Sequence, residues 1–130
     1  GPFAHLRPNS HLGQDVHIGN FVEVKNSTLG AGVKSGHLTY IGDADLGRDI
    51  NIGCGTIFVN YDGKKKHRST VGDQAFIGCN ANIVSPVKIG DQTFIAAGTT
   101  VTRDVPDQAL AISRVKQDNI PNYWQKFSKK

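Results

Sequence analysis

The chain has 130 residues, the length of one ordinary domain, and carries a net charge of +4. A mildly basic balance of this kind suits a small anionic ligand. Basic residues are not interleaved with aromatic ones, which argues against a nucleic-acid partner, and no apolar run reaches the roughly 18 residues of a membrane span. The two cysteines lack metal-ligand spacing and predict a reducing, cytoplasmic compartment.

The first predicted element begins near the N-terminus, where a large aliphatic residue recurs at almost every sixth position. This period matches neither a helix nor a strand and predicts a short-repeat solenoid, in which each hexapeptide forms one flat strand and one corner. Two steps, Val24 to Leu29 and Ile41 to Leu46, are one residue short. The series, in which Ser35 is the one polar member, is Leu6, Leu12, Ile18, Val24, Leu29, Ser35, Ile41, Leu46, Ile52, Phe58, Val71, Ile77, Ile83, Ile89, Ile95 and Val101.

A second series supports this register, because a small or β-branched residue stands two places before each member. Three hexapeptides make one triangular coil, so we predict an all-β, left-handed parallel β-helix of a little over five coils, covering residues 1–102. Gly72, Gly78 and Gly90 directly follow aliphatic residues, and we expect corners there whose backbone angles are closed to residues with a Cβ.

The histidines His5, His11 and His17 also recur at every sixth position, which raises the question of a zinc site. At this spacing each histidine lies on a different face of the prism. The three side chains therefore cannot converge on one ion within the chain. We expect surface histidines and no metal site.

Residues at equal positions in successive coils form ladders along the prism, because the coils stack about 4.8 Å apart. One outward ladder combines a histidine with small side chains, which would form a shallow groove for an extended ligand. Small outward residues can equally pack against another subunit, and both interpretations stay open. This small-residue ladder consists of Asn20, His37, Cys54, Cys79 and Ala97.

Two other arrangements bear on chemistry. Arg7 and Lys25 are expected one coil apart, where the two cations repel unless an anion such as phosphate lies between them or solvent screens them. Cys54 beside His37 also permits a nucleophile–base pair, although no third group that would orient the base is evident. The fold suits direct transfer between two bound substrates better.

The interval between Phe58 and Val71 is too long for the repeat, so its excess, residues 60–68 (NYDGKKKHR), must loop out. This loop is either a solvated insertion or, because residues 64–68 are all basic, part of an anion site. Residues 103–130 form an irregular closing segment with a basic tail. A short helix is expected around Tyr123, Trp124 and Phe127, with the aromatic rings packing on the last coil to cap its strand edges.

The sequence resembles the acetyltransferase domain of the bacterial bifunctional enzyme N-acetylglucosamine-1-phosphate uridyltransferase and glucosamine-1-phosphate N-acetyltransferase. The resemblance covers residues 1–117, and the family's magnesium-dependent uridyltransferase domain is absent from these 130 residues. The combination of GHLTYIGD with NYDGK is specific, whereas hexapeptides alone indicate only the fold. The matching motifs are GPFAHLRP, VHIGNFVEVKNSTLG, GHLTYIGDADLG, NIGCGTI, NYDGKKKH, IAAGTTVT and AISRVKQ.

The resemblance implies that His37 is the general base, which takes a proton from the 2-amino group of the sugar. This role requires a neutral imidazole. The implied glucosamine-1-phosphate site consists of Arg7, Lys25, Tyr40, Asn51 and Lys66. The implied acetyl-CoA site consists of Cys54, Asn60, Tyr61, Cys79, Ala97 and Arg114, with Asn60 and Tyr61 shaping the reaction centre.

The sequence departs from the family pattern at Cys54, usually alanine, and at Cys79, usually serine. Neither change removes a backbone donor, and the backbone N–H of position 54 is expected to hold the developing oxyanion. Phe58 and Val59 also replace smaller or polar residues that often precede NYDG.

The resemblance further implies a homotrimer with sites between subunits, acting in UDP-N-acetylglucosamine supply for peptidoglycan and lipopolysaccharide. An alternative is a catalytically silent β-helix that serves trimerisation or regulation of a sugar nucleotidyltransferase. A third possibility is an acyltransferase for another amino sugar or an antibiotic, against which the NYDG loop argues.

Overall fold

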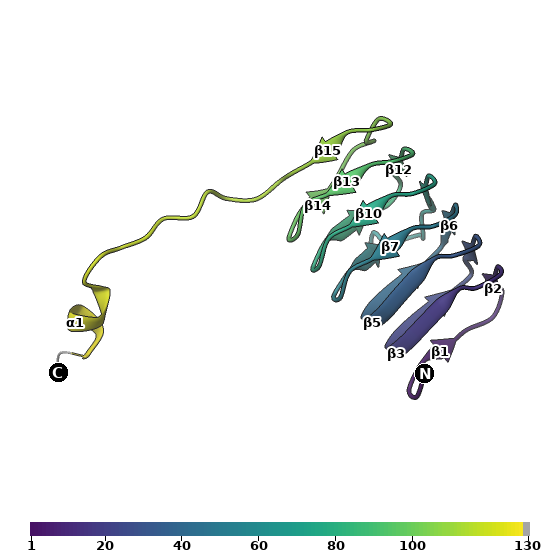
Figure 1. Ribbon diagram of the computed structural model, residues 1–130, viewed down its shortest axis with the longest axis horizontal. Helices are drawn as coiled ribbons and strands as arrows, with labels where there is room; N and C mark the ends of the chain where they lie inside the picture. Colours follow the sequence, from purple (N-terminus) through teal and green to yellow (C-terminus); the bar gives the residue numbers. More distant parts are fainter. Residues whose placement is uncertain (129–130) are drawn as a thin grey trace.

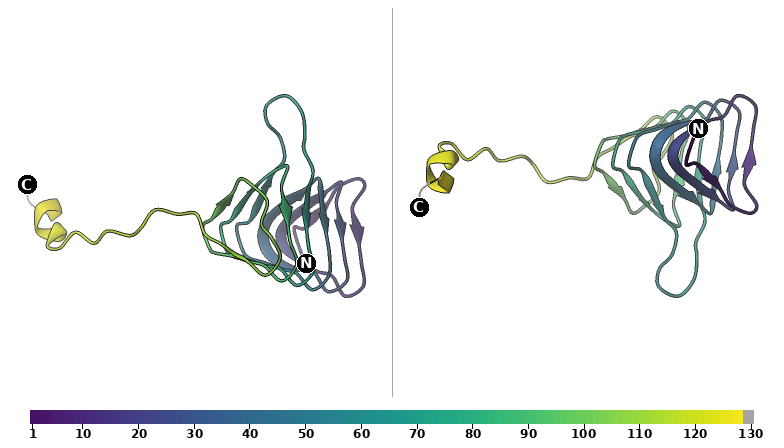
Figure 2. Two further views of the ribbon diagram at one scale, coloured as in Figure 1. Left: turned by 90° about the horizontal axis from the view of Figure 1, so that it is seen from above. Right: turned by 90° about the horizontal axis from the view of Figure 1, so that it is seen from below.

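The computed structural model describes residues 1–128 and confirms the predicted fold class, a parallel β-helix of about six coils. Short strands run around a triangular prism, and the coils stack along one axis (Figures 1 and 2). The strands are β1 (His5–Leu6), β2 (His11–Leu12), β3 (His17–Lys25), β4 (Thr28–Leu29), β5 (Lys34–Gly42), β6 (Ala44–Leu46), β7 (Asn51–Ile52), β8 (Ile57–Val59), β9 (Ser69–Val71), β10 (Phe76–Ile77), β11 (Asn82–Val84), β12 (Lys88–Ile89), β13 (Phe94–Ile95), β14 (Thr100–Val101) and β15 (Leu110–Ala111).

Parallel, in-register pairing of these strands builds three inward stacks, and counting the aliphatic series in threes predicts the first two of them. The first stack is Ile18, Ser35, Ile52, Ile77 and Ile95, extended by Ala111. The second is Leu6, Val24, Ile41, Phe58, Ile83 and Val101. The third is Leu12, Leu29, Leu46, Val71 and Ile89, closed by Val105.

Corners of the prism use positive φ angles, and most of these belong to Asn, Asp and Gln, as at Asn80 with a φ of 58°. The expectation for Gly72, Gly78 and Gly90 was wrong, because none of the three is among the residues with positive φ. They are required by the close approach of the next coil. A Cβ on Gly78 would lie 2.6 Å from the backbone nitrogen of Ala97.

The coiling continues beyond Val101, where the aliphatic series ends. Val105 is buried and bridges to Ile89, and β15 pairs in parallel with β13. Because Val105 lies off the spacing of the repeat, the pattern does not reveal this last, incomplete coil.

The tail contains the expected short helix, α1 (Tyr123–Ser128), joined to the prism by an extended segment that leads away from it (Figure 1). Tyr123, Trp124 and Phe127 stay exposed, so the expected packing of these rings on the last coil is wrong. Lys129 and Lys130 of the predicted basic tail lie outside the described residues. Within residues 1–128, no helix has the length and apolar character needed to cross a membrane.

Ser35 is the polar member of the first stack and is fully buried between Ile18 and Ile52. Its Oγ has no hydrogen-bond partner within the described residues. A buried hydroxyl without a partner destabilises the folded state, since it loses its bonds to water and gains none in return.

We therefore predict that Ser35→Ala raises the free energy of unfolding by about 1 kcal/mol. Ser27→Ala is the matched control and should lower it, because Ser27 Oγ donates to the Lys25 carbonyl at 2.8 Å and accepts from the Ala44 N–H at 3.0 Å. Denaturant unfolding at one fixed protein concentration measures both changes. A loss of stability in Ser35→Ala as large as that in Ser27→Ala would contradict the prediction.

Candidate active site

The small-residue ladder forms as predicted. Asn20 pairs with His37 between β3 and β5, and the pairing of β7, β10 and β13 places Cys54, Cys79 and Ala97 at the same position in the following coils. Both thiols are free, as expected. His37, Cys79 and Ala97 are exposed and Cys54 is half-buried, so the ladder can be reached from solvent.

The backbone N–H groups of Cys54, Cys79 and Ala97 have no hydrogen-bond acceptor within residues 1–128. In contrast, the N–H groups of the preceding residues Gly53 and Gly78 donate to carbonyls of the next coil at 2.8 and 2.9 Å. The ladder therefore presents a row of unused donors, one in each of three successive coils. Such a row suits the amide carbonyls of an extended ligand.

His37 lies on β5 immediately before a corner of the prism, which is formed by Leu38 with a φ of 52°. Within the described part of the chain, its imidazole makes no side-chain hydrogen bond. Tyr40 lies on the same strand beyond that corner. The strand thus connects the ladder on one face with a second group of polar residues on the next face.

This second group is a cation cluster made of Arg7, Lys25 and Lys66. Arg7 follows Leu6, which pairs with Val24, so Arg7 and Lys25 lie one coil apart as predicted. Each has an acidic partner: Arg7 Nη1 lies 2.9 Å from Glu23 Oε2, and Lys25 Nζ lies 3.1 Å from Asp43 Oδ2. Repulsion between the stacked cations is therefore already reduced within the chain.

Lys66 reaches this cluster from the projecting loop. The Lys25 ammonium lowers the pKa of Lys66, and Arg7 adds to that effect. Positive charge therefore remains in excess around Lys66 despite the two carboxylates. An anion bound among the three cations would neutralise this excess positive charge.

Asp43 is the centre of a buried polar network, with an exposed fraction of 5%. Its carboxylate accepts from Asn26 Nδ2 at 2.7 Å, from Asn60 Nδ2 at 2.7 Å and from Lys25 Nζ. Asn60 Nδ2 also donates to the Tyr40 hydroxyl at 3.1 Å. Burial opposes ionisation of Asp43, but the hydrogen bonds from Asn26, Lys25 and Asn60 outweigh it and lower the pKa of the carboxyl.

The loop of residues 60–68 projects from one edge of the prism (Figure 2) and is organised by its own contacts. Asp62 accepts from the backbone N–H groups of Lys64 and Lys65, both at 2.8 Å, and contacts His67 Nε2 at 2.7 Å. The hydrogen bond with His67, followed by those from the backbone, lowers the pKa of Asp62 to about 2. At the base, Arg68 pairs with Asp45 at 2.7 Å.

The remaining predicted site residues are distributed as follows. Arg114 Nη1 donates to the Ala97 carbonyl at 2.9 Å and so lies at the end of the ladder. Tyr61 is exposed on the loop, where its hydroxyl donates to Gly63. Asn51, on β7, forms no side-chain hydrogen bond with the cation cluster within residues 1–128. One chain therefore brings Arg7, Lys25, Tyr40, Asn60 and Lys66 together, but not Asn51.

His5, His11 and His17 are exposed on β1, β2 and β3, three strands of different stacks. They do not converge, as their spacing predicted. No group of three or more His, Cys, Asp or Glu side chains suited to a metal ion occurs within the described residues.

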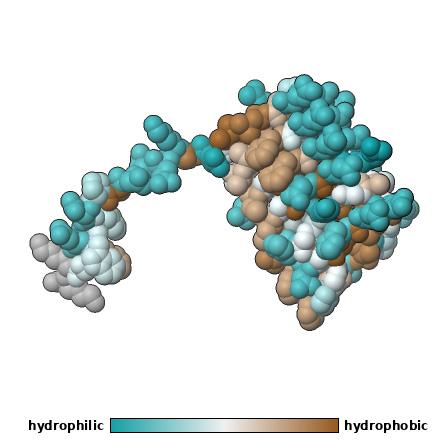
Figure 3. Space-filling model, in the orientation of Figure 1, coloured by the Kyte–Doolittle hydropathy of each residue, from teal (hydrophilic) through white to brown (hydrophobic). Residues whose placement is uncertain are grey.

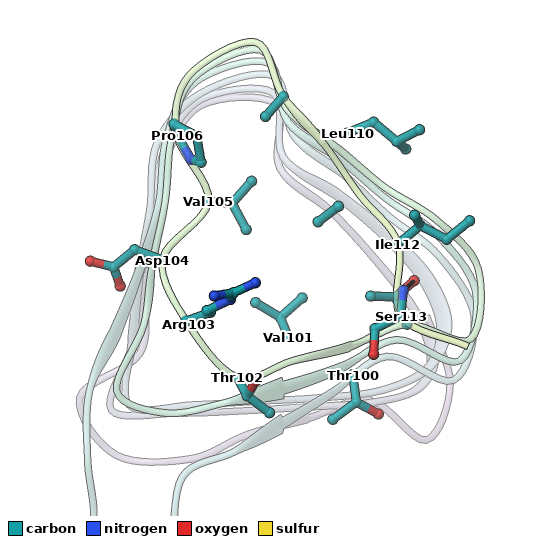
Figure 4. A pocket seen from close by; sticks show the side chains of 13 residues that line it. Thr100, Val101, Thr102, Arg103, Asp104, Val105, Pro106, Leu110, Ile112 and Ser113 are labelled. Atoms are coloured by element: carbon teal, nitrogen blue, oxygen red, sulfur yellow. Dashed lines mark hydrogen bonds between the residues drawn. The ribbon is translucent and has the colours of Figure 1, made fainter. Parts of the chain in front are cut away.

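A cavity of about 440 Å³ opens at the C-terminal end of the prism, where no further coil covers the core (Figure 4). Val101 and Val105 line it, and the Arg103 side chain points into it. None of the predicted site residues lines this cavity. It is the open end of the solenoid and not the candidate active site.

Comparison with known proteins supports this description. Residues 68–103 match the family "Bacterial transferase hexapeptide (six repeats)". The chain is 66% identical over 119 residues to the bifunctional protein GlmU of Caldicellulosiruptor saccharolyticus, covering 92% of this chain and 26% of that protein. It is 57% identical over 126 residues to GlmU of Clostridium perfringens, covering 97% of this chain and 28% of that protein.

A solved structure, PerB from Caulobacter crescentus in complex with CoA and GDP-perosamine, superposes with a TM-score of 0.78 at 29% identity. The match covers 86% of this chain and 52% of that chain. Fold and repeats thus define the class of bacterial hexapeptide-repeat proteins. The chain belongs to the GlmU family, and it spans about a quarter of the length of the curated relatives it matches.

Proposed function

We propose that the chain catalyses the acetyl-CoA-dependent N-acetylation of glucosamine-1-phosphate. The observation that carries this proposal is the course of β5, which presents His37 on the small-residue ladder and Tyr40, beyond the next corner, beside the cation cluster. An acetyl donor along the ladder and a sugar phosphate at the cluster would meet at that corner. Similarity to GlmU proteins, and to PerB bound to CoA and a nucleotide-linked sugar, supports this pairing of substrates.

In the proposed reaction, His37 accepts a proton from the 2-amino group of the sugar as the nitrogen attacks the acetyl carbon of the thioester. The new N–C bond forms, the C–S bond breaks, and CoA leaves with the sulfur electron pair and recovers a proton. The exposed imidazole, free of side-chain partners within residues 1–128, is available for this role. The unused N–H of Cys54 would stabilise the negative charge on the acetyl oxygen.

The ladder provides the binding surface for the coenzyme. The unused N–H groups of Cys79 and Ala97 would donate to amide carbonyls of the pantetheine arm, and their small side chains leave room for it. Arg114, at the end of the ladder, would attract the coenzyme phosphates. The cation cluster would hold the sugar phosphate between Arg7, Lys25 and Lys66.

A homotrimer would complete the site. Phe76, Phe94 and Leu110 occupy one outward row and are 41%, 49% and 60% exposed, and the two rings stack at 4.6 Å. Apolar side chains gather on this face of the prism (Figure 3). Asn51 precedes Phe76 in the same row. Covering this face with a second subunit would bury the apolar row and bring Asn51 to a neighbouring cation cluster.

The proposed physiological role is cytoplasmic supply of N-acetylglucosamine-1-phosphate for UDP-N-acetylglucosamine, the precursor of peptidoglycan and lipopolysaccharide. A reducing compartment suits the two free thiols. Mass spectrometry of a reaction with acetyl-CoA and glucosamine-1-phosphate tests the proposal, which requires formation of the N-acetylated sugar phosphate.

His37→Ala should lower kcat by about a hundredfold or more, because the amine would lose its general base. The affinity for acetyl-CoA should stay near that of the parent protein, since coenzyme binding uses the backbone of the ladder. Stopped-time assays of CoA release measure kcat, and calorimetric titration with CoA measures the affinity for the coenzyme. An unchanged kcat would remove His37 from the mechanism.

Alkylation of Cys54 and Cys79 should inhibit the enzyme because the added groups fill the groove along the small-residue ladder, and not because a nucleophile is lost. Bound acetyl-CoA should protect Cys54 and Cys79 from the reagent, whereas glucosamine-1-phosphate should protect them less. Cys54→Ala should retain activity and become less sensitive to alkylation, as followed by mass spectrometry and CoA release. An inactive Cys54→Ala protein, or an acetyl group trapped on Cys54, would favour covalent catalysis over direct transfer.

A further inference from the structure

We propose that Asp43 is a positioning residue of the sugar-phosphate site. Its carboxylate would hold Lys25 and, through Asn60, the base of the projecting loop and the Tyr40 hydroxyl in the arrangement that receives the phosphate. This inference rests on the function proposed above. The family resemblance gave no role to Asp43.

The position of Asp43 follows from the two shortened steps of the repeat. Asn26 and Asp43 each stand two residues after an aliphatic residue, Val24 and Ile41, in the steps that are one residue short. Both have positive φ, 47° and 53°, so both tightened corners turn through a left-handed residue. Because the corners are stacked one coil apart, the Asn26 amide reaches the Asp43 carboxylate at 2.7 Å.

The contacts of Asp43 join three separate parts of the chain. Lys25 and Asn26 lie one coil earlier, and Asn60 is the first residue of the loop. Asn60 Nδ2 in turn donates to the Tyr40 hydroxyl on β5. Lys25 is 15% and Asp43 7% exposed at the side chain, so solvent screens this pair little. The three donors Asn26, Lys25 and Asn60 together bond both carboxylate oxygens of Asp43, so the carboxylate has little freedom to rotate.

Asn60 links the hydrogen-bond network of Asp43 to the projecting loop. Its carbonyl accepts from the His67 N–H at 2.7 Å, and Lys66 directly precedes His67. Lys66 also bridges to Tyr61 across the loop. When Asp43 holds the Asn60 side chain in place, the bond between the Asn60 carbonyl and the His67 N–H also holds the neighbouring Lys66 near the cation cluster.

Two roles for Asp43 predict opposite effects of removing its charge. If Asp43 acted only as a nearby negative charge, its loss would make the cluster more positive and would strengthen phosphate binding. If Asp43 positions the cluster, its loss releases Lys25 to repel Lys66 and leaves Asn60 without its buried partner. Phosphate binding then weakens although the site has become more positive.

The experiment is steady-state kinetics of Asp43→Asn in the full chain. Asparagine tolerates the positive φ of this corner and removes the charge. We expect the KM for glucosamine-1-phosphate to rise by about tenfold or more, because charge-assisted hydrogen bonds are lost. The KM for acetyl-CoA should change by a smaller factor, since the backbone donors of Cys54, Cys79 and Ala97 are untouched and, of the implied acetyl-CoA site, only Asn60 contacts Asp43.

Asp45→Asn is the matched control, because Asp45 lies two residues away, in the middle of β6, and pairs with Arg68 and not with the cation cluster. Its KM values should match those of the parent protein. Asn26→Gly keeps a residue suited to positive φ and removes one donor to Asp43. It should raise the KM for the sugar phosphate by a smaller factor, and it decides the question if Asp43→Asn does not fold.

A lower or unchanged KM for the sugar phosphate in a folded Asp43→Asn protein would overturn the positioning role. So would a loss of kcat with no change in KM, which is the signature of a merely structural defect. A parent protein that neither binds nor acetylates glucosamine-1-phosphate would instead overturn the proposed function, and this assignment with it.

Discussion

Parallel stacking of the coils in register sets the position of side chains along the prism. Backbone N–H groups of one coil donate to carbonyls of the next, as from Gly53 to Ile77 and from Gly78 to Ile95, at 2.8 and 2.9 Å. Residues at equal positions are therefore forced into rows along the prism. The same rule that stacks Ile41, Phe58 and Ile83 in the core also lines up His37, Cys54 and Cys79 outside it.

The candidate site lies where this regularity is interrupted. Two corners are shortened at Asn26 and Asp43, and one interval is lengthened by the loop of residues 60–68. These irregularities meet, because the Asn60 amide at the base of the loop contacts the Asp43 carboxylate at 2.7 Å. A perfectly regular solenoid offers only flat rows. The interruptions supply Asp43, the buried acid that holds Lys25, and Lys66, the third cation of the cluster.

Much of this arrangement follows from the sequence, because a fixed period converts sequence position directly into spatial position. The period correctly placed two of the three stacks, the small-residue ladder and the stacking of Arg7 on Lys25. It could not show that Glu23 and Asp43 pair with those cations, since side-chain partners across corners depend on backbone angles that the period does not contain. The sequence did contain one signal of this network. Asn26 and Asp43 occupy the same position in the two short steps, which stacks one above the other.

Other features escaped prediction for separate physical reasons. Val105 and Ala111 continue the core off the repeat spacing, so the last coil has no periodic signature. The glycines after the aliphatic residues were attributed to backbone angles, whereas the approach of the next coil excludes a Cβ there. The aromatic tail was expected to cap the prism, because the last coil leaves exposed strand edges. Tyr123 and Trp124 remain exposed.

We propose that one strand, β5, joins an acetyl-transfer ladder to a phosphate-binding cation cluster. The most direct measurement compares kcat/KM for glucosamine-1-phosphate with kcat/KM for glucosamine, following CoA release at saturating acetyl-CoA. If the cluster of Arg7, Lys25 and Lys66 holds the phosphate, the phosphorylated sugar should be preferred by about a hundredfold or more. Equal values for the two sugars would contradict the account, because acetyl transfer would then proceed without the cluster.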